Sequence, residues 1–308
     1  MAKPFRFGVS TSTAGSASEW RERAQKAEDL GYDVFHVADH LRQSFQPMIA
    51  LAFAAEATRS IRLGTFVINN DFRHPVVMAR EAASVDFLSG GRLEFGIGAG
   101  HAGDEYREAG MPFDKPAVRV ARLAESVEVL KRLWTEDSVT FEGTHFQLKD
   151  CPSFPKPAQT TIPVLIGGNG RNVLELAARQ ANIVGFTGIF LDDAGRGIVF
   201  PHFTAEGLAN RVDIVREAAG ERFDGLELNL LVQGVETEKP RERAEEWAST
   251  LKLEPDDLMT SPFTAFGSVD QLEQKLLEQR ERLGISYICT HWPGIDALAP
   301  VVARLRGK

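Results

Sequence analysis

The 308-residue sequence is poor in cysteine and lacks long apolar runs. Its two cysteines, Cys151 and Cys289, stand far apart and outside any CxxC or other metal-ligand spacing, so a disulfide framework or a zinc site is not indicated. We expect two buried or half-buried free thiols, as in the reducing cytoplasm. No apolar stretch reaches the roughly 20 residues of a membrane helix, and the start of the chain shows no secretory apolar segment. Neither a membrane nor a metal is therefore an expected partner.

Clustered positive charge is also missing. The chain has 35 Lys and Arg against 43 Asp and Glu, a formal net charge of −8 that is scattered along the sequence. Binding to nucleic acid needs gathered Lys and Arg, so nucleic acid is not an expected partner. No serine lies in a GxSxG motif, which leaves hydrolase chemistry poorly supported. A GxGxxG motif after the first predicted strand is absent as well, and Gly96–Gly100 resembles one only superficially.

What the chain does have is an alternation of short apolar runs with amphipathic helical segments. Eight runs are predicted as strands, at 5–10, 33–38, 61–68, 92–98, 163–168, 182–188, 226–233 and 285–290. Helices are predicted at 18–30, 47–58, 75–88, about 117–134, 170–180, about 202–219, 240–252, 268–283 and 295–306. The strands are apolar at nearly every position, as in sheets covered on both faces. Eight even units in about 300 residues predict an α/β fold, the (β/α)₈ TIM barrel, over a doubly wound sheet.

Residues 137–160 interrupt this rhythm. They contain a predicted β-hairpin around Glu142-Gly143, followed by a Pro-rich stretch. We interpret the segment as an insertion after the fourth β/α unit, so residues 1–308 are predicted to form a single domain.

The active site of such a barrel lies at the C-terminal ends of its strands. Asp39 and His40 follow the second strand. A nearby carboxylate can fix the tautomer of an imidazole, so His40 is a candidate for proton transfer. The alternative is a histidine that merely satisfies its own strand end. His36 and His40 are four apart, but the surrounding residues indicate a strand, and the helical metal-pair spacing loses its meaning there.

The stretch Gly167-Gly168-Asn169-Gly170 leads straight into a predicted helix. Glycines let a backbone approach a ligand, and the exposed N–H groups at a helix start favour an anion, which points to a phosphate site. The alternative is a tight turn that needs glycine for positive φ.

Across these residues the chain resembles the luciferase-like flavin and deazaflavin oxidoreductases, in particular their F420-dependent branch. The matching stretches are FHVADH (35–40), LGTFV (63–67), HPV (74–76) through Asp86, GRLEFGIGAG (91–100), PVLIGG (163–168) and FGS (266–268). Their order and spacing together carry the resemblance, which spans nearly the whole chain.

This resemblance implies a TIM barrel with a non-prolyl cis peptide behind the cofactor's tricyclic ring, at Phe66-Val67. It also implies that Asp39 and Asn69 lie near the ring and that Ala99 and Asp104 line the cofactor site. The cofactor tail and its phosphate would pass Gly167, Gly168, Asn169 and Gly170. A homodimer is implied as well.

His40 matches the catalytic base of the F420-dependent sugar-phosphate dehydrogenases. The chain departs from that pattern at Ser44, which replaces a tryptophan, and at His101, which replaces an acidic residue. A sugar-phosphate substrate therefore does not follow. His40 and His101 both remain candidates for the catalytic proton transfer.

The expected activity is hydride transfer between coenzyme F420 and a small organic substrate. One alternative is an FMN-dependent monooxygenase that uses reduced FMN and oxygen, with a flavin or F420 reductase as a possible partner. A lesser alternative is a non-catalytic protein, a flavin-binding barrel or a barrel without a cofactor, that serves as a sensor or structural subunit.

Overall fold

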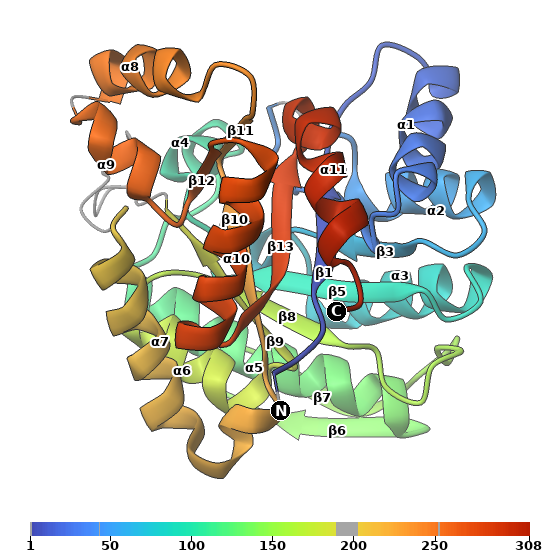
Figure 1. The fold of residues 1–308 in the computed structure, drawn as a ribbon. Coiled ribbons are helices and arrows are strands. Elements are labelled where there is room, and N and C mark those ends of the chain that lie inside the picture. The colour runs from blue at the N-terminus through green and yellow to red at the C-terminus, as the bar shows by residue number, and fades with distance from the viewer. Residues whose placement is uncertain (1, 43, 189–202, 252) are drawn as a thin grey trace.

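A computed structural model describes residues 2–42, 44–188, 203–251 and 253–308 (Figure 1). The predicted (β/α)₈ barrel is confirmed. Its strands run parallel in the order β3-β2-β1-β13-β10-β9-β8-β5-β4, and pairing of β3 with β5 closes the sheet. The strands are β1 (Arg6–Ser10), β2 (Val34–Val37), β3 (Arg62–Thr65), β4 (Ile68–Asn69), β5 (Leu93–Gly98), β8 (Val164–Gly167), β9 (Ile183–Thr187), β10 (Glu227–Val232) and β13 (Ile285–His291).

The third predicted strand is split into β3 and β4 by the Phe66-Val67 peptide bond, which is cis, as the family resemblance implies. Both parts pair with β5. Leu63 opposes Leu93, whereas Ile68 opposes Ile97, so the third strand carries one more residue than its partner over this stretch. That extra residue makes a β-bulge at the upper end of the barrel wall.

Helices surround the barrel (Figure 1). They are α1 (Ala17–Asp29), α2 (Pro47–Ala57), α3 (Pro75–Leu88), α5 (Pro116–Thr135), α6 (Arg171–Gln180), α7 (Ala205–Ala219), α10 (Val269–Leu283) and α11 (Ile295–Leu305). Proline at the first position of α2, α3 and α5 fits these starts, because that N–H has no partner inside the helix. No helix in the described ranges is both long and apolar enough to cross a bilayer.

Smaller elements decorate this plan. The predicted hairpin is present as β6 (Ser138–Glu142) and β7 (Gln147–Pro152), and Glu125 of α5 holds its turn by accepting the Thr144 and His145 N–H groups. Among the described residues, the α-helices and strands that were not predicted are α4 (Gly103–Glu108), β11 (Gly234–Glu236), α9 (Pro255–Thr260) and β12 (Thr264–Phe266), and three short 3-10 helices were not predicted either. Helix α8 (Pro240–Leu251) was expected.

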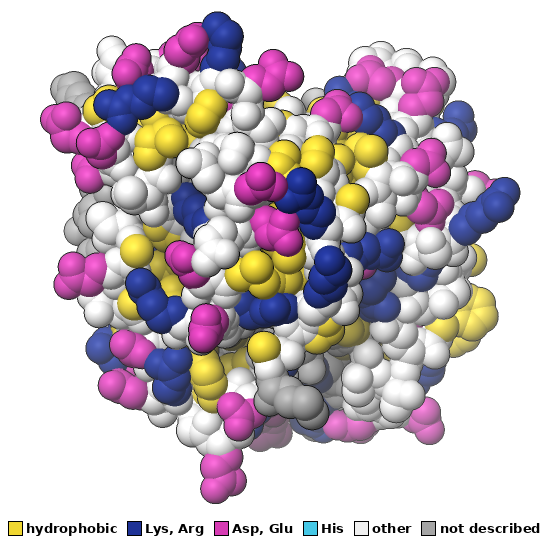
Figure 2. Space-filling view, in the orientation of Figure 1, with side chains coloured by type: hydrophobic (Ala, Val, Ile, Leu, Met, Phe, Trp, Pro, Cys, Tyr) yellow, Lys and Arg dark blue, Asp and Glu magenta, His cyan; other side chains and the backbone are white. Residues whose placement is uncertain are grey.

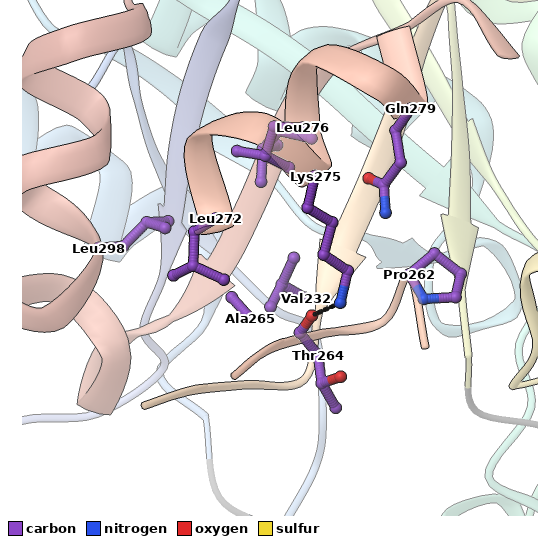
Figure 3. A pocket seen from close by; sticks show the side chains of 10 residues that line it. Val232, Pro262, Thr264, Ala265, Leu272, Lys275, Leu276, Gln279 and Leu298 are labelled. Carbon is purple, nitrogen blue, oxygen red and sulfur yellow. Dashed lines mark hydrogen bonds between the residues drawn. The ribbon is translucent and has the colours of Figure 1, made fainter. Parts of the chain in front are cut away.

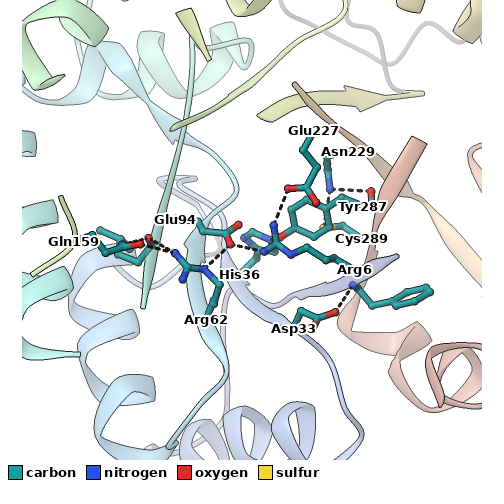
Figure 4. Close-up of polar contacts among 12 residues, drawn as sticks. Arg6, Asp33, His36, Arg62, Glu94, Gln159, Glu227, Asn229, Tyr287 and Cys289 are labelled. Atoms are coloured by element: carbon teal, nitrogen blue, oxygen red, sulfur yellow. Dashed lines mark hydrogen bonds and ion pairs between the residues drawn. The ribbon is translucent and has the colours of Figure 1, made fainter. Parts of the chain in front are cut away.

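A polar layer fills the lower barrel (Figure 4). Arg6 forms ion pairs with Glu94 and Glu227, and Arg62 Nε lies 2.6 Å from the same Glu94 carboxylate. Above them the His36 Nε2 atom lies 2.6 Å from the Tyr287 hydroxyl. The charged residues of this layer lie at or next to the starts of their strands, at the end of the barrel opposite to the one where an active site is expected.

Candidate active site at the mouth of the barrel

The bulge at Phe66-Val67 forms the centre of the barrel mouth. Both residues are half-buried although they lie among strand ends, which is the exposure expected of residues that line a hollow. A Cβ on Gly98 would stand 3.0 Å from Val67 Cγ2, and a Cβ on Gly167 would stand 3.4 Å from Val67 Cγ1. Glycines on β5 and β8 therefore make room for Val67. The outline of the molecule is notched at this end, between α8 and α1 (Figure 2).

Asp39 follows β2, and its side chain contacts Asn69 at the end of β4 and Arg73 beyond it. Its buried carboxylate accepts hydrogen bonds from Arg73, at 2.6 and 3.2 Å, and from the backbone N–H of Asn69 at 3.0 Å. Sequence reasoning missed Arg73, although a buried carboxylate calls for a cationic partner. Direct contact between Asp39 and a cofactor stays a prediction.

Asn69 has its side chain held in one orientation. Its Oδ1 accepts from the Asp71 N–H at 3.1 Å and from the Tyr106 hydroxyl at 2.9 Å. The amide nitrogen is therefore the end that can donate to a ligand. Gly100 has φ +75°, and a Cβ there would stand 2.7 Å from Asn69 Oδ1 and would collide with the Tyr106 hydroxyl.

His40 is paired with a carboxylate that the sequence did not single out. Its Nδ1 lies 2.8 Å from Oε1 of Glu105, and Oε2 of the same carboxylate accepts the Leu41 N–H at 3.2 Å. Glu105 is only 6% exposed and belongs to α4, a helix that was not predicted because it follows a glycine-rich segment.

His101 lies next to His40, with the ring centroids 5.4 Å apart and the planes at 83°. Its surface is open to solvent, yet protein atoms surround it on most sides, as for a side chain inside an open hollow. This environment lowers the pKa of His101 to about 4, mainly by desolvation and then by repulsion from His40; Glu105 opposes the shift, and Arg119 adds a smaller lowering effect. His101 is therefore neutral near pH 7.

Two further predicted cofactor residues lie nearby. Ala99 is half-buried, and its carbonyl accepts from Arg119 Nε at 3.3 Å. Asp104 is half-buried in the first turn of α4 and pairs with Arg107 at 2.5 Å. Their contact with a cofactor stays a prediction.

The glycine-rich stretch connects β8 to α6. The described residues with positive φ include none of Gly167, Gly168, Asn169 and Gly170, so the alternative of a positive-φ turn is wrong. A Cβ on Gly168 would instead collide with Val173 of α6, so glycine here lets the turn pack closely on the helix. Gly170 is the N-cap of α6 and has no capping side chain, which leaves first-turn N–H groups available to an anion. Asn169 Oδ1 accepts from Thr187 N–H and Arg211.

Three residues that were not among the predicted catalytic or cofactor residues lie together at the ends of β9, β10 and β13. Gln233 Nε2 donates to Thr187 Oγ1 at 3.0 Å, and its Oε1 lies 3.4 Å from Nε2 of His291. Burial lowers the pKa of His291. Each residue lies at or just past the end of β9, β10 or β13, and that position is the signal that could have found them.

A separate pocket lies on the flank of the barrel, beneath α10 (Figure 3). There the Lys275 ammonium group donates to the carbonyls of Ser261 at 2.6 Å and Thr264 at 2.8 Å. Desolvation lowers its pKa to about 8. The lysine thus fastens the start of β12 and the residues before it to α10.

Comparison with known proteins adds a family match. Residues 1–219 match the luciferase-like monooxygenase family. The F420-dependent glucose-6-phosphate dehydrogenase of Intrasporangium calvum is 37% identical over 171 residues, which cover 51% of this chain and 50% of that protein. The enzyme of the same name from Nakamurella multipartita is 29% identical over 302 residues, 94% of this chain and 83% of that one. The chain spans about half the length of the first of these relatives.

Solved structures share the fold. An F420-dependent secondary alcohol dehydrogenase in complex with an F420-acetone adduct has a TM-score of 0.79 at 21% identity, over 98% of this chain and 99% of that one. The F420-dependent tetrahydromethanopterin reductase of Methanopyrus kandleri has a TM-score of 0.80 at 19% identity, over 98% and 100%. A long-chain alkane monooxygenase reaches 0.76 at 14% identity, over 99% and 92%.

Proposed function

Because the chain belongs to the luciferase-like monooxygenase family, we propose that it is an F420-dependent oxidoreductase that transfers a hydride between the deazaflavin and a small organic substrate. The observation that carries this proposal is the half-buried Phe66-Val67 bulge, together with the adjacent rings of His40 and His101, which follow the two strands, β2 and β5, that pair with β3. Relatives named as F420-dependent dehydrogenases favour F420 over FMN.

The residues at the mouth fit a flat heterocycle with a phosphate-bearing tail. Val67 packs against glycines on two neighbouring strands. Because these glycines have no side chains, the protein surface on which the ring would lie carries no bulky group at these positions. The free amide nitrogen of Asn69 can donate to the ring edge, with Asp39, Phe66, Ala99 and Asp104 around it. The tail would pass Gly167, Gly168, Asn169 and Gly170 to the start of α6, whose N–H groups favour phosphate.

When bound, F420 supplies the carbon that accepts or donates the hydride. The protein supplies orientation and the group that moves the accompanying proton. His40 and His101 are the two candidates, since both rings stand at the mouth within 5.4 Å of each other. The substrate is a small molecule, and an alcohol or its ketone fits a site in which imidazole exchanges a proton with oxygen.

Titration of the purified protein with F420 and with FMN tests the proposal. We expect saturable quenching of F420 fluorescence at low micromolar concentration or below. Tight FMN binding without an F420 response would overturn the choice of cofactor. The control variant is Asn182→Ala, which should bind F420 as the wild type does. Asn182 lies at the opposite end of the barrel, where its side chain accepts the Val164 N–H.

The second candidate is an FMN-dependent monooxygenase, favoured by the family match itself. It would consume oxygen in the presence of reduced FMN and would need a reductase as partner. Oxygen uptake that depends on reduced FMN would support it over F420 chemistry. Binding of neither cofactor would leave the non-catalytic alternative.

We further propose a homodimer built on α2 and α3, which pack side by side. Helix α2 is apolar except for Glu56, and Ile49 and Phe53 on its outer face are 63% and 48% exposed. Val77 of α3 adds to this surface. A second copy of the chain would cover it symmetrically. Light scattering should give a dimer for the wild type and a monomer for the Ile49→Asp, Phe53→Asp double variant.

The two cysteines support a cytoplasmic location. Both are free thiols, and burial raises the pKa of Cys289 to about 12, which keeps it protonated. Free thiols persist in reducing compartments.

A further inference from the structure

The two histidines at the mouth differ in what holds them. His40 Nδ1 lies 2.8 Å from a carboxylate oxygen of Glu105, a residue that is buried at the side of the hollow. His101 meets His40 edge-to-face and is open to solvent. The same Glu105 carboxylate also accepts the Leu41 N–H, so Glu105 contacts both the His40 ring and the backbone of the next residue.

We propose that Glu105 is the positioning residue of this site and that it makes His40, rather than His101, the group that exchanges the substrate proton. The inference rests on the proposed function, because it concerns the proton that accompanies the hydride. The proposal also assigns a role to α4, which carries Glu105. This short helix follows β5, and Glu105 ties it to the loop after β2.

The chemistry follows from what an ionised carboxylate can do. It only accepts hydrogen bonds, so its partner Nδ1 carries the imidazole proton and Nε2 keeps the lone pair. In oxidation of an alcohol, the hydroxyl proton would pass to Nε2, and the carbinol carbon would lose its hydrogen with the bonding electron pair as a hydride, which F420 would accept when bound. The carbon–oxygen bond becomes a carbonyl, and the imidazolium that results is stabilised by the adjacent carboxylate. Reduction of a ketone runs the same transfers backwards.

His101 takes a different part in this arrangement. A proton on His101 would stand beside the proton that His40 holds during the reaction, and the two cations would repel each other. His101 therefore stays neutral and can donate one hydrogen bond to the substrate oxygen. That contact orients the oxygen toward His40 without taking its proton.

Nuclear magnetic resonance on the cofactor-free protein tests the assignment directly. Histidine labelled with ¹⁵N, with the His40 signals assigned from their loss in His40→Gln, reports the tautomer of the ring. We expect a protonated Nδ1 and an unprotonated Nε2 in the wild type at pH 8. An Nε2–H tautomer in the wild type would overturn the proposal, and this measurement needs no substitution at Glu105.

Glu105→Gln provides the second measurement, because it keeps the shape of the side chain and removes its charge. We expect the His40 ring of Glu105→Gln to lose its single tautomer and to show both the Nδ1–H and the Nε2–H form, because an amide can donate as well as accept. The matched control is Glu108→Gln, an exposed glutamate of the same helix that pairs with Arg42, and it should keep the wild-type Nδ1–H tautomer. The same single tautomer in Glu105→Gln and wild type would contradict the proposal.

Kinetics then separate positioning from binding. With F420 and an alcohol that the wild type oxidises, Glu105→Gln should lower kcat at least about tenfold and move the acidic limb of the pH profile, while the Kd for F420 stays within about twofold. An unchanged pH profile would count against Glu105. Failure of the wild type to bind F420 would instead contradict the proposed function, and the resonance result would stand by itself.

Discussion

Val67 lies directly against Gly98, with its Cγ2 atom only 3.0 Å from the place where a Cβ on that glycine would stand. The same valine meets Gly96 and Gly167, so three glycines from two strands surround one side chain at the bulge. The bulge adds one residue to the third strand, and the glycines give that residue space inside the barrel. The floor of the candidate site is thus set by backbone shape and by the absence of side chains opposite it.

Gly96→Ala should destabilise the protein more than other glycine substitutions. A Cβ at Gly96 would collide with the carbonyl oxygen of Thr65, which is backbone and cannot swing aside, and it would stand 3.2 Å from Val67. We expect a loss of about 2–3 kcal/mol in the free energy of unfolding, as for an overpacked core. Urea denaturation measures it. Gly225→Ala is the control, because the added Cβ there meets nothing within 4 Å, and it should be neutral. Equal losses for the two variants would contradict this account.

Asp39→Asn should be costly because the Arg73 cation would lose the nearer of its two charged partners and keep only the Glu81 carboxylate, 3.8 Å away. The Asp39 side chain is 4% exposed and the Arg73 side chain 16%. Breaking such a pair from one side costs about 3 kcal/mol or more. Asp213→Asn is the matched control, because its ion pair with Arg216 is exposed and should contribute under about 1 kcal/mol. Chemical denaturation of both variants at pH 7 compares them, and similar values would show that Asp39 is not held as the structure indicates.

The barrel was predictable from the sequence, whereas most of the site's internal contacts were not. Apolar runs such as 163–168 and 285–290 mark strands because both faces of a barrel strand are buried. The split at Phe66-Val67 came from family resemblance, since no pattern of residue types encodes it. Helix α4 was missed because its six residues follow a glycine-rich segment and are too few to show a period.

The partners of the predicted residues depend on closure of the barrel. Glu105 is 65 residues from His40, and Arg73 is 34 residues from Asp39. The sequence placed His40 and Asp39 at a strand end, which was sufficient to nominate them. It could not say which carboxylate His40 would meet, because Asp39 is its neighbour in the chain and yet binds Arg73.

Acid should destabilise the protein through His36. Burial lowers the pKa of His36 to about 3, from an unfolded value near 6.5, so the unfolded chain binds the proton first as pH falls. Stability is therefore fully present above pH 6.5 and is lost as pH drops toward 3. Between pH 6.5 and 5 this one group should remove about 2 kcal/mol. Urea unfolding across this range measures the slope, and in His36→Gln it should be shallower by one proton. Parallel slopes below pH 6.5 for variant and wild type would contradict a neutral, buried His36.

Tyr106→Phe should weaken cofactor binding indirectly, through the orientation of the Asn69 side chain. The Tyr106 hydroxyl shares its single proton between Asn69 Oδ1 at 2.9 Å and Asp71 Oδ2 at 3.1 Å. It is one of two donors to Asn69 Oδ1, and its loss leaves only the Asp71 N–H to hold the amide oxygen away from the ligand. We expect the Kd for F420 to rise about fivefold to tenfold, the equivalent of one hydrogen bond, while stability falls by about 1 kcal/mol. Asn69→Leu, which removes the donor outright, should weaken binding at least as much, and in that background Tyr106→Phe should have little further effect. Fluorescence titration of the three variants gives the cycle. Additive losses would show that Tyr106 acts independently of Asn69, and the orientation of the amide would then not be what the hydroxyl controls.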